Sequence, residues 1–140
     1  MSDRFFLDTN VFVYCFNTDA PSKAQRAREL IHQAVTTRKG IVSFQVVQEF
    51  FNVALRRFSQ PMKVPEAEQY LATVFRPLLA IHSSLSLYAE ALQLAARFQL
   101  SWYDSLIVAA ALEGECNILY TEDLRTGQQF GEMRVQNPFS

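Results

Sequence analysis

The sequence predicts an α/β fold in which helices cover both faces of a mainly parallel sheet. Short apolar runs of strand length alternate along the chain with longer segments of helical period. Acidic residues follow the first and fourth of these runs directly, as expected at the carboxyl edge of a parallel sheet. With 140 residues and 49% hydrophobic content, the chain is long enough to bury one core. We therefore expect residues 1–140 to form a single domain.

The first half of the chain yields two predicted strands and four predicted helices. Residues 4–7 and 41–42 are the strands, and the helices are expected at 11–16, 23–38, 44–58 and 65–75. Gly40 is expected to stop the second helix, Ser43 to cap the third, and Pro77 to close the fourth. The third helix has an apolar stripe that consists of Phe44, Val47, Phe51, Ala54, Leu55 and Phe58.

The second half continues the alternation. A strand is expected at 78–81, and a helix with Leu87 to Phe98 follows, capped by Ser84 or Ser86. Ser101 caps a further helix at 102–113, which Gly114 ends. Two more short strands are expected at 118–120 and 134–136.

Charge and cysteine usage narrow the class of protein. A formal charge of −1 and a pI of about 6.1 argue against binding nucleic acid through bulk positive charge. These values are compatible with a nuclease that binds a short stretch of nucleic acid through a metal ion and a few arginines. Cys15 and Cys116 fit no metal or redox spacing and are expected to be reduced thiols. With neither a leader peptide nor a membrane-length apolar run in the sequence, we expect a soluble, cytoplasmic protein without membrane contact.

Four acids occupy positions from which they can meet at one edge of the sheet. Asp8 and Asp123 each come directly after a predicted strand. Glu49 lies on the polar side of the helix after Ser43, and Asp104 lies in the first turn of the helix after Ser101. Each acid also has a simpler interpretation. Asp8 and Asp123 suit turns or helix caps, Glu49 suits a solvated helix face, and Asp104 suits a capping box with Ser101.

The chemistry of the set favours a metal site. Several carboxylates brought together repel one another and raise at least one pKa unless a cation neutralises them. Oxygen ligands without His or Cys prefer Mg²⁺ or Mn²⁺ to zinc. Such an ion binds a phosphate oxygen and activates a water molecule, so the set suits phosphodiester hydrolysis.

Four segments of the sequence resemble the motifs of the PIN domain family, and specifically its VapC toxins from toxin–antitoxin systems. The segments lie in the family's order and span nearly the whole chain; they are 6–11 (FLDTNV), 43–50 (SFQVVQEF), 100–107 (LSWYDSLI) with 109–111 (AAA), and 119–124 (LYTEDL).

The resemblance implies a fold, an activity and a site. The fold would be a three-layer α/β/α sandwich on a mainly parallel sheet of about five strands. The activity would be Mg²⁺- or Mn²⁺-dependent endonuclease cleavage of RNA. The implied catalytic and metal-binding acids are Asp8, Glu49, Asp104 and Asp123, supported by Thr9, Asn10, Thr121 and Glu122. Glu122 and Asp123 are adjacent, so either could be the fourth acid, although Asp123 fits the Thr-x-Asp spacing. The implied partners are RNA, a cognate antitoxin and a second copy of the chain.

Three other functions compete with a toxin ribonuclease. A PIN-type nuclease in RNA processing and a catalytically silent PIN-like binding module would have similar sequences. A phosphotransfer enzyme of the haloacid dehalogenase type would use Asp8 as its nucleophile. That family carries a second acid two residues later, where this chain has Asn10, and no lysine follows Asp104 here.

Overall fold

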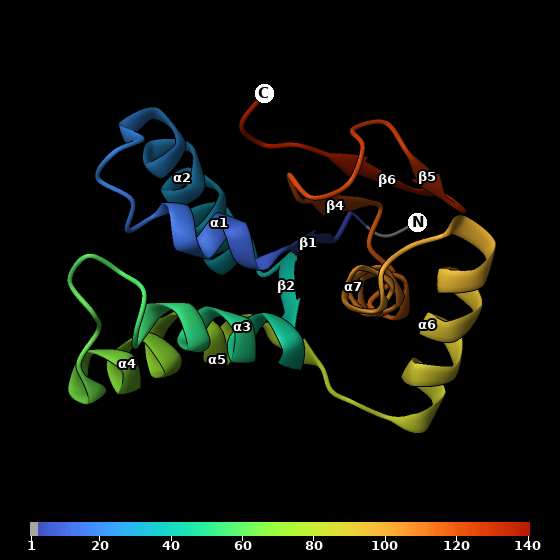
Figure 1. The fold of residues 1–140 in the computed structure, drawn as a ribbon. Helices are drawn as coiled ribbons and strands as arrows, with labels where there is room; N and C mark the ends of the chain where they lie inside the picture. The colour runs from blue at the N-terminus through green and yellow to red at the C-terminus, as the bar shows by residue number, and fades with distance from the viewer. Residues whose placement is uncertain (1–2) are drawn as a thin grey trace.

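Residues 3–140, which the computed structural model describes, form a six-stranded sheet with helices on both sides (Figure 1). The strands are β1 (Phe5–Leu7), β2 (Gly40–Ser43), β3 (Leu79–Ile81), β4 (Ile118–Tyr120), β5 (Gln129–Phe130) and β6 (Met133–Gln136). Their order is β3-β2-β1-β4-β6-β5, and all neighbours run parallel except β5 and β6. The predicted fold class is thus confirmed. The strand that the sequence did not predict is β5, a two-residue edge strand too short to show alternation.

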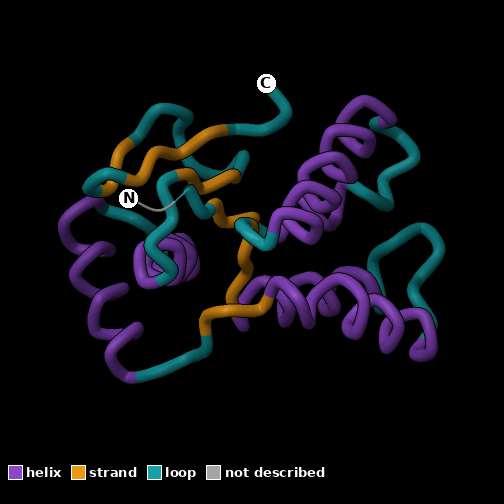
Figure 2. Tube along the Cα trace, turned by 180° about the vertical axis from the view of Figure 1, so that it is seen from behind, coloured by secondary structure: helices purple, strands orange, loops and turns teal. Residues whose placement is uncertain are grey.

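The helices lie in two groups beside the strands (Figure 2). Helices α6 and α7 lie together on one side, and the others lie on the opposite side (Figure 1). Their bounds are α1 (Thr9–Tyr14), α2 (Pro21–Thr37), α3 (Phe44–Ala54), α4 (Val64–Tyr70), the π-helical turn η1 (Leu71–Phe75), α5 (Arg76–Leu78), α6 (Leu85–Phe98) and α7 (Trp102–Glu113). Within residues 3–140, none of these helices is long and apolar enough to cross a membrane.

Two residues predicted to end helices, Gly40 and Pro77, do not do so. Arg38, in the left-handed conformation at φ 61°, caps α2, whereas Gly40 already belongs to β2. Gly40 is needed for close packing instead, because a Cβ atom there would lie 2.2 Å from the Cβ of Ala34. Pro77 does not close the helix before it but lies inside α5, directly after the wide turn η1. Ser84, one of the two candidates, caps α6 by accepting a hydrogen bond from the Leu87 amide at 3.0 Å.

The apolar stripe predicted for α3 is wrong in phase. The fully buried apolar residues of this helix are Val46, Phe50 and Ala54, whereas Phe44, Val47 and Phe51 are only partly buried. The polar residues of α3 share one side and its apolar residues the other, but the predicted stripe followed one edge of the apolar side and left out Phe50. Phe50 packs among the rings of α1, η1 and α4, including a stacked contact with Tyr70 at 5.0 Å. This packing fixes the face on which Glu49 lies.

Candidate active site

Asp8 and Thr121 lie side by side at the carboxyl ends of β1 and β4. These strands are neighbours, and the register pairs Leu7 with Tyr120, one residue before each of the two. Asp8 is 5% exposed and Thr121 is fully buried. The Thr121 hydroxyl donates to Oδ2 of Asp8 at 2.7 Å, while Oδ1 accepts from the Thr9 amide at 2.7 Å. Asp8 therefore caps α1 and also presents a fixed, buried carboxyl at the sheet edge, so its two interpretations are compatible.

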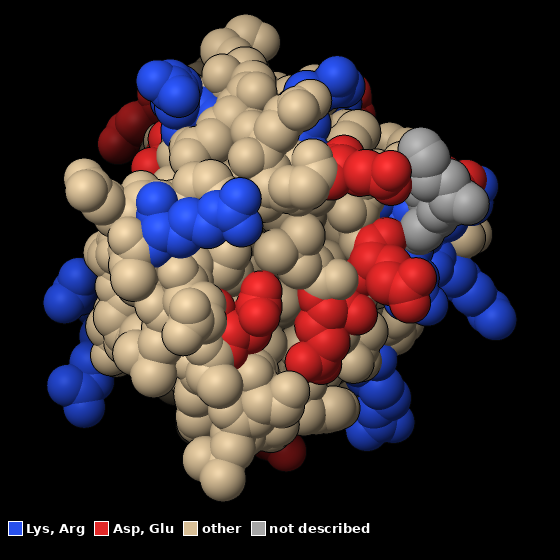
Figure 3. All heavy atoms as spheres, turned by 90° about the vertical axis from the view of Figure 1, so that its right-hand side faces the viewer, with Lys and Arg blue, Asp and Glu red and all other residues tan. Residues whose placement is uncertain are grey.

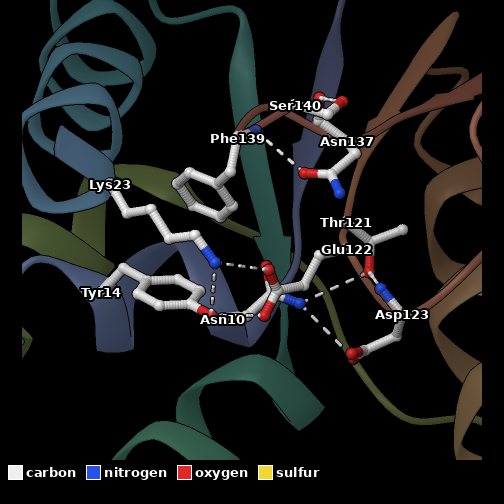
Figure 4. Close-up of polar contacts among 9 residues, drawn as sticks. All are labelled: Asn10, Tyr14, Lys23, Thr121, Glu122, Asp123, Asn137, Phe139 and Ser140. Carbon is white, nitrogen blue, oxygen red and sulfur yellow. Dashed lines mark hydrogen bonds and ion pairs between the residues drawn. The ribbon is translucent and has the colours of Figure 1, made fainter. Parts of the chain in front are cut away.

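Asn10 and Asp123 meet above this pair. The Thr121 hydroxyl oxygen accepts from the Asp123 amide at 3.0 Å. The Asn10 side-chain amide donates toward that same oxygen at 3.5 Å and toward Oδ2 of Asp123 at 3.4 Å (Figure 4). Oδ1 of Asn10 is buried and has no hydrogen-bond partner within residues 3–140. An orphaned oxygen beside carboxylates is a ready ligand for a cation or its bound water.

Glu49 faces this cluster from α3. The Thr9 hydroxyl donates to Oε1 of Glu49 at 2.9 Å, so the carboxylate is tied to the residue that follows Asp8. Glu49 is partly exposed and lines the same pocket as Asp8. The polar side of α3 has three environments: Gln45 is buried against α7, Glu49 lines the pocket, and Asn52 is exposed.

Asp104 lies in the first turn of α7. Its backbone amide donates to the Ser101 hydroxyl at 3.2 Å, which is the amide half of the predicted capping box. Its carboxylate acts on Asp123 electrostatically, raising the pKa of that group. Gln45 holds the start of α7, because its side-chain amide donates to the backbone carbonyl of Tyr103 at 3.2 Å.

Glu122 lines the same pocket as Asp123, but its carboxylate is held by Tyr14 and Lys23. Tyr14 donates its hydroxyl to Oε1 of Glu122 at 2.8 Å, and Lys23 lies 3.8 Å from Oε2 (Figure 4). Lys23 also donates to the Tyr14 hydroxyl at 3.3 Å, which closes a triangle of three side chains. Of the two adjacent acids, Asp123 is thus the one beside Asn10. The sequence analysis missed Tyr14 and Lys23, since nothing local links them to a residue about 100 positions away.

Burial and mutual repulsion raise the pKa values of two acids in the cluster. Burial raises the pKa of the Asp8 carboxyl to about 7, against the hydrogen bonds from Thr121 and Thr9, and the charges of Asp123 and Glu49 add to the rise. Burial also raises the pKa of Asp123, as do the charges of Asp104 and Glu122. An added positive charge would relieve both effects.

Three of the four predicted acids, Asp8, Glu49 and Asp123, line an open pocket of about 460 Å³, which we call the acidic pocket. Glu122 lines it as well, whereas Asp104 is not part of its lining. Its lining includes Asp8, Asn10, Glu49 and Asp123, whose donor atoms are hard oxygens of the kind that Mg²⁺ and Mn²⁺ prefer. Within residues 3–140, no three His, Cys, Asp or Glu side chains converge closely enough to enclose an ion directly. Hydrogen bonds to Thr9, Thr121 and Asn10 hold these carboxylates instead. The donor set fits a hard divalent ion, but the groups do not form a closed cage.

Comparison with known proteins finds a matching family model and several solved structures of similar fold. The model of the PIN domain matches residues 5–129. No curated protein matches the sequence at a significant level.

Three solved structures illustrate the likeness. FitAB bound to an IR36 DNA fragment has a TM-score of 0.70 at 22% identity, covering 97% of this chain and 96% of its own. VapC20 from Mycobacterium tuberculosis, described as a sarcin–ricin loop cleaving toxin, has a TM-score of 0.64 at 21% identity, covering 93% and 98%. A toxin–antitoxin complex from Klebsiella pneumoniae has a TM-score of 0.63 at 19% identity, covering 96% and 97%. At these identities the likeness shows a shared fold.

Proposed function

This chain belongs to the PIN domain family, and on that premise we propose that it is a metal-dependent endoribonuclease. The observation that carries the proposal is the placement of Asp8, buried at the end of β1 with its pKa raised to about 7 and with Glu49 and Asp123 around the same pocket. A buried carboxylate costs stability unless a positive charge compensates it, and carboxyls with raised pKa values cluster at functional sites.

The proposed roles follow from the positions of the four acids. Asp8, Glu49, Asp104 and Asp123 would hold Mg²⁺ or Mn²⁺, which supplies charge neutralisation of the phosphate and an activated water. Thr121 and Thr9 orient Asp8 and Glu49 by hydrogen bonds, and Asn10 orients Asp123. Among residues 3–140 the Asp104 carboxylate has no hydrogen bond to these three polar side chains, and Asp104 is positioned through the start of α7.

We further propose that the protein is the toxin of a toxin–antitoxin pair. The structures similar in fold include one described as a toxin–antitoxin complex and one described as a sarcin–ricin loop cleaving toxin. The partners would then be an antitoxin protein, the RNA substrate and a second copy of this chain, in the cytoplasm. A PIN nuclease of RNA processing would share the chemistry and lack the antitoxin.

Cleavage of RNA by the purified chain tests the activity. The wild-type protein is expected to cut a labelled single-stranded RNA with Mg²⁺ or Mn²⁺, and EDTA is expected to stop it. Asp8→Asn and Asp104→Asn should each lower the rate by at least 100-fold, beyond the 10- to 100-fold typical of groups that only support a ligand. Glu90→Gln, an exposed acid on α6, is the matched control and should cut at the wild-type rate.

Thermal unfolding tests the metal independently of cleavage. Millimolar Mg²⁺ or Mn²⁺ should raise the Tm of the wild type, because binding to the folded state alone stabilises it. The same ion should raise the Tm of Asp8→Asn much less. Cutting that survives EDTA, or an unchanged Tm in the wild type, would contradict the proposal.

A further inference from the structure

A second pocket continues the acidic pocket along α3. It has a volume of about 300 Å³ and shares Val13, Asn17 and Val53 with the acidic pocket, so the two form one groove between α1 and α3. At its far end the lining includes Arg57 and the rings of Phe16 and Phe58. We call this end the Arg57 pocket.

Arg57 lies in the turn that directly follows α3, on the side of that helix that carries Glu49. Its backbone amide donates to the carbonyl of Val53 at 2.7 Å, so helical geometry continues one turn beyond Ala54. Glu49, Val53 and Arg57 are spaced four residues apart, which places their side chains in one row along the groove. At 1.5 Å per residue, Arg57 lies about 12 Å along the helix from Glu49. Within residues 3–140, no ion pair engages the Arg57 guanidinium.

Phe16 provides an aromatic surface beside Arg57. Its ring stacks on Phe58 at 5.1 Å and meets Tyr70 edge-on at 5.5 Å, so packing holds it rigidly. The side chain is still 39% exposed. A fixed aromatic ring with a free surface can stack an unpaired base, whatever the identity of that base.

From these observations we propose that the Arg57 pocket binds single-stranded RNA one or more nucleotides away from the cut, with a phosphate on Arg57 and a base on Phe16. The choice of RNA rests on the proposed function and on charge complementarity. An arginine pairs well with phosphate. The face over α6, by contrast, carries a group of acidic side chains (Figure 3). Asp19 also lines the Arg57 pocket and would oppose the phosphate.

The chain offers a matched control in Arg56. It adjoins Arg57 and is likewise exposed, yet it does not line either part of the groove. Arg57→Gln and Arg56→Gln therefore remove the same charge from neighbouring positions. Phe16→Leu keeps apolar packing and removes the ring.

Binding in EDTA tests the proposal without requiring cleavage. The probe is a fluorescein-labelled, unstructured ten-nucleotide RNA, and its affinity is measured by fluorescence anisotropy at several salt concentrations. Arg57→Gln should weaken binding about tenfold and reduce the slope of log affinity against log salt by about 0.7, the loss of one phosphate contact. Phe16→Leu should weaken binding about fivefold with the slope unchanged. Asp19→Asn should strengthen binding, and Arg56→Gln should match the wild type.

The outcomes separate this proposal from the proposed activity. Weaker binding by Arg57→Gln, with Arg56→Gln unchanged, supports the Arg57 pocket whether or not the wild type cuts RNA. A wild type that fails to cut RNA with metal would refute the proposed ribonuclease activity and leave the Arg57 pocket standing. Equal affinity of Arg57→Gln and Arg56→Gln would overturn the Arg57 pocket as an RNA site, as would a wild type that does not bind the probe. In both cases the Arg57 pocket would be refuted as an RNA site even if the wild type cleaves RNA.

Discussion

The Thr121 hydroxyl donates to Oδ2 of Asp8 at 2.7 Å, joining residues 113 positions apart in the chain. The same hydroxyl oxygen accepts from the Asp123 amide at 3.0 Å. One buried side chain thus orients two of the four acids, and it does so because β1 and β4 are neighbours in register. Because the contact is short and fully buried, its loss costs more free energy than the loss of a surface hydrogen bond.

Replacing Thr121 by Val tests the importance of this hydroxyl. Valine keeps the shape but leaves a buried carboxylate oxygen of Asp8 and the Asp123 amide without their partner. We expect the free energy of unfolding at pH 8 to fall by about 1–3 kcal/mol, the cost of an unsatisfied buried group. Chemical denaturation measures it. Thr73→Val, which removes an exposed hydroxyl from η1, is the control and should change stability by less than about 0.5 kcal/mol.

The raised pKa of Asp8 predicts how stability depends on pH in the metal-free protein. The group titrates near its ordinary 3.8 when unfolded and at about 7 when folded. Between these values the folded state holds a proton that the unfolded state has released. The contribution of this proton to the free energy of unfolding is therefore complete below about pH 4 and is lost as the pH rises through 7. At 1.36 kcal/mol per unit, it amounts to about 4 kcal/mol.

Unfolding in EDTA from pH 4 to 8 measures this dependence. The wild type should lose stability with rising pH, and Asp8→Asn, which cannot ionise there, should show a flatter profile. Glu90→Gln should keep the wild-type profile. A wild-type profile as flat as that of Asp8→Asn would mean that Asp8 is already ionised in the folded protein.

Much of the site could be predicted because its acids follow local signals. Asp8 comes directly after a short apolar run, and that position does not depend on exact strand bounds. Asp104 lies three residues after a capping serine, which fixes its place in a first helical turn. The fold class follows equally from local alternation, and it is confirmed.

What could not be predicted depends on packing between distant segments. The order of the strands places Asp8 beside Thr121, and no local pattern encodes which strands are neighbours. The predicted phase of α3 is wrong because the apolar side of that helix is broad, and only packing against the rings of α1, η1 and α4 selects Phe50 as its buried centre. The hydrogen bond from Tyr14 to Glu122 spans 108 positions and has no sequence signal.

The contacts of Glu122 predict which of the two adjacent acids supports cleavage. Asp123→Asn should lower the rate of RNA cleavage by at least 100-fold, because Asp123 lies beside Asn10 in the acidic pocket. Glu122→Gln should change it by less than about threefold, since that side chain is held by Tyr14 and Lys23. Single-turnover rates with Mn²⁺ measure both. The reverse order of effects would make Glu122 the fourth acid.

Gln45 predicts a loss of activity without a loss of stability. Its side-chain amide donates to the carbonyl of Tyr103 at 3.2 Å, next to Asp104, and its Oε1 is buried without a partner among residues 3–140. Gln45→Met keeps the length of the side chain and removes both groups. The lost hydrogen bond and the removed unsatisfied oxygen should nearly offset, leaving the free energy of unfolding within about 1 kcal/mol of the wild type.

The effect on the site should be larger, since Gln45 joins the helix of Glu49 to the start of the helix of Asp104. The Mn²⁺ concentration for half-maximal cleavage should rise about 10-fold or more, as for other groups that orient a ligand without touching the metal. Titration of the cleavage rate with Mn²⁺ measures this shift. Gln48→Met, on the exposed side of the same helix, should leave the titration unchanged. A similar curve for Gln45→Met and the wild type would show that the backbone of α7 holds Asp104 in place without this contact.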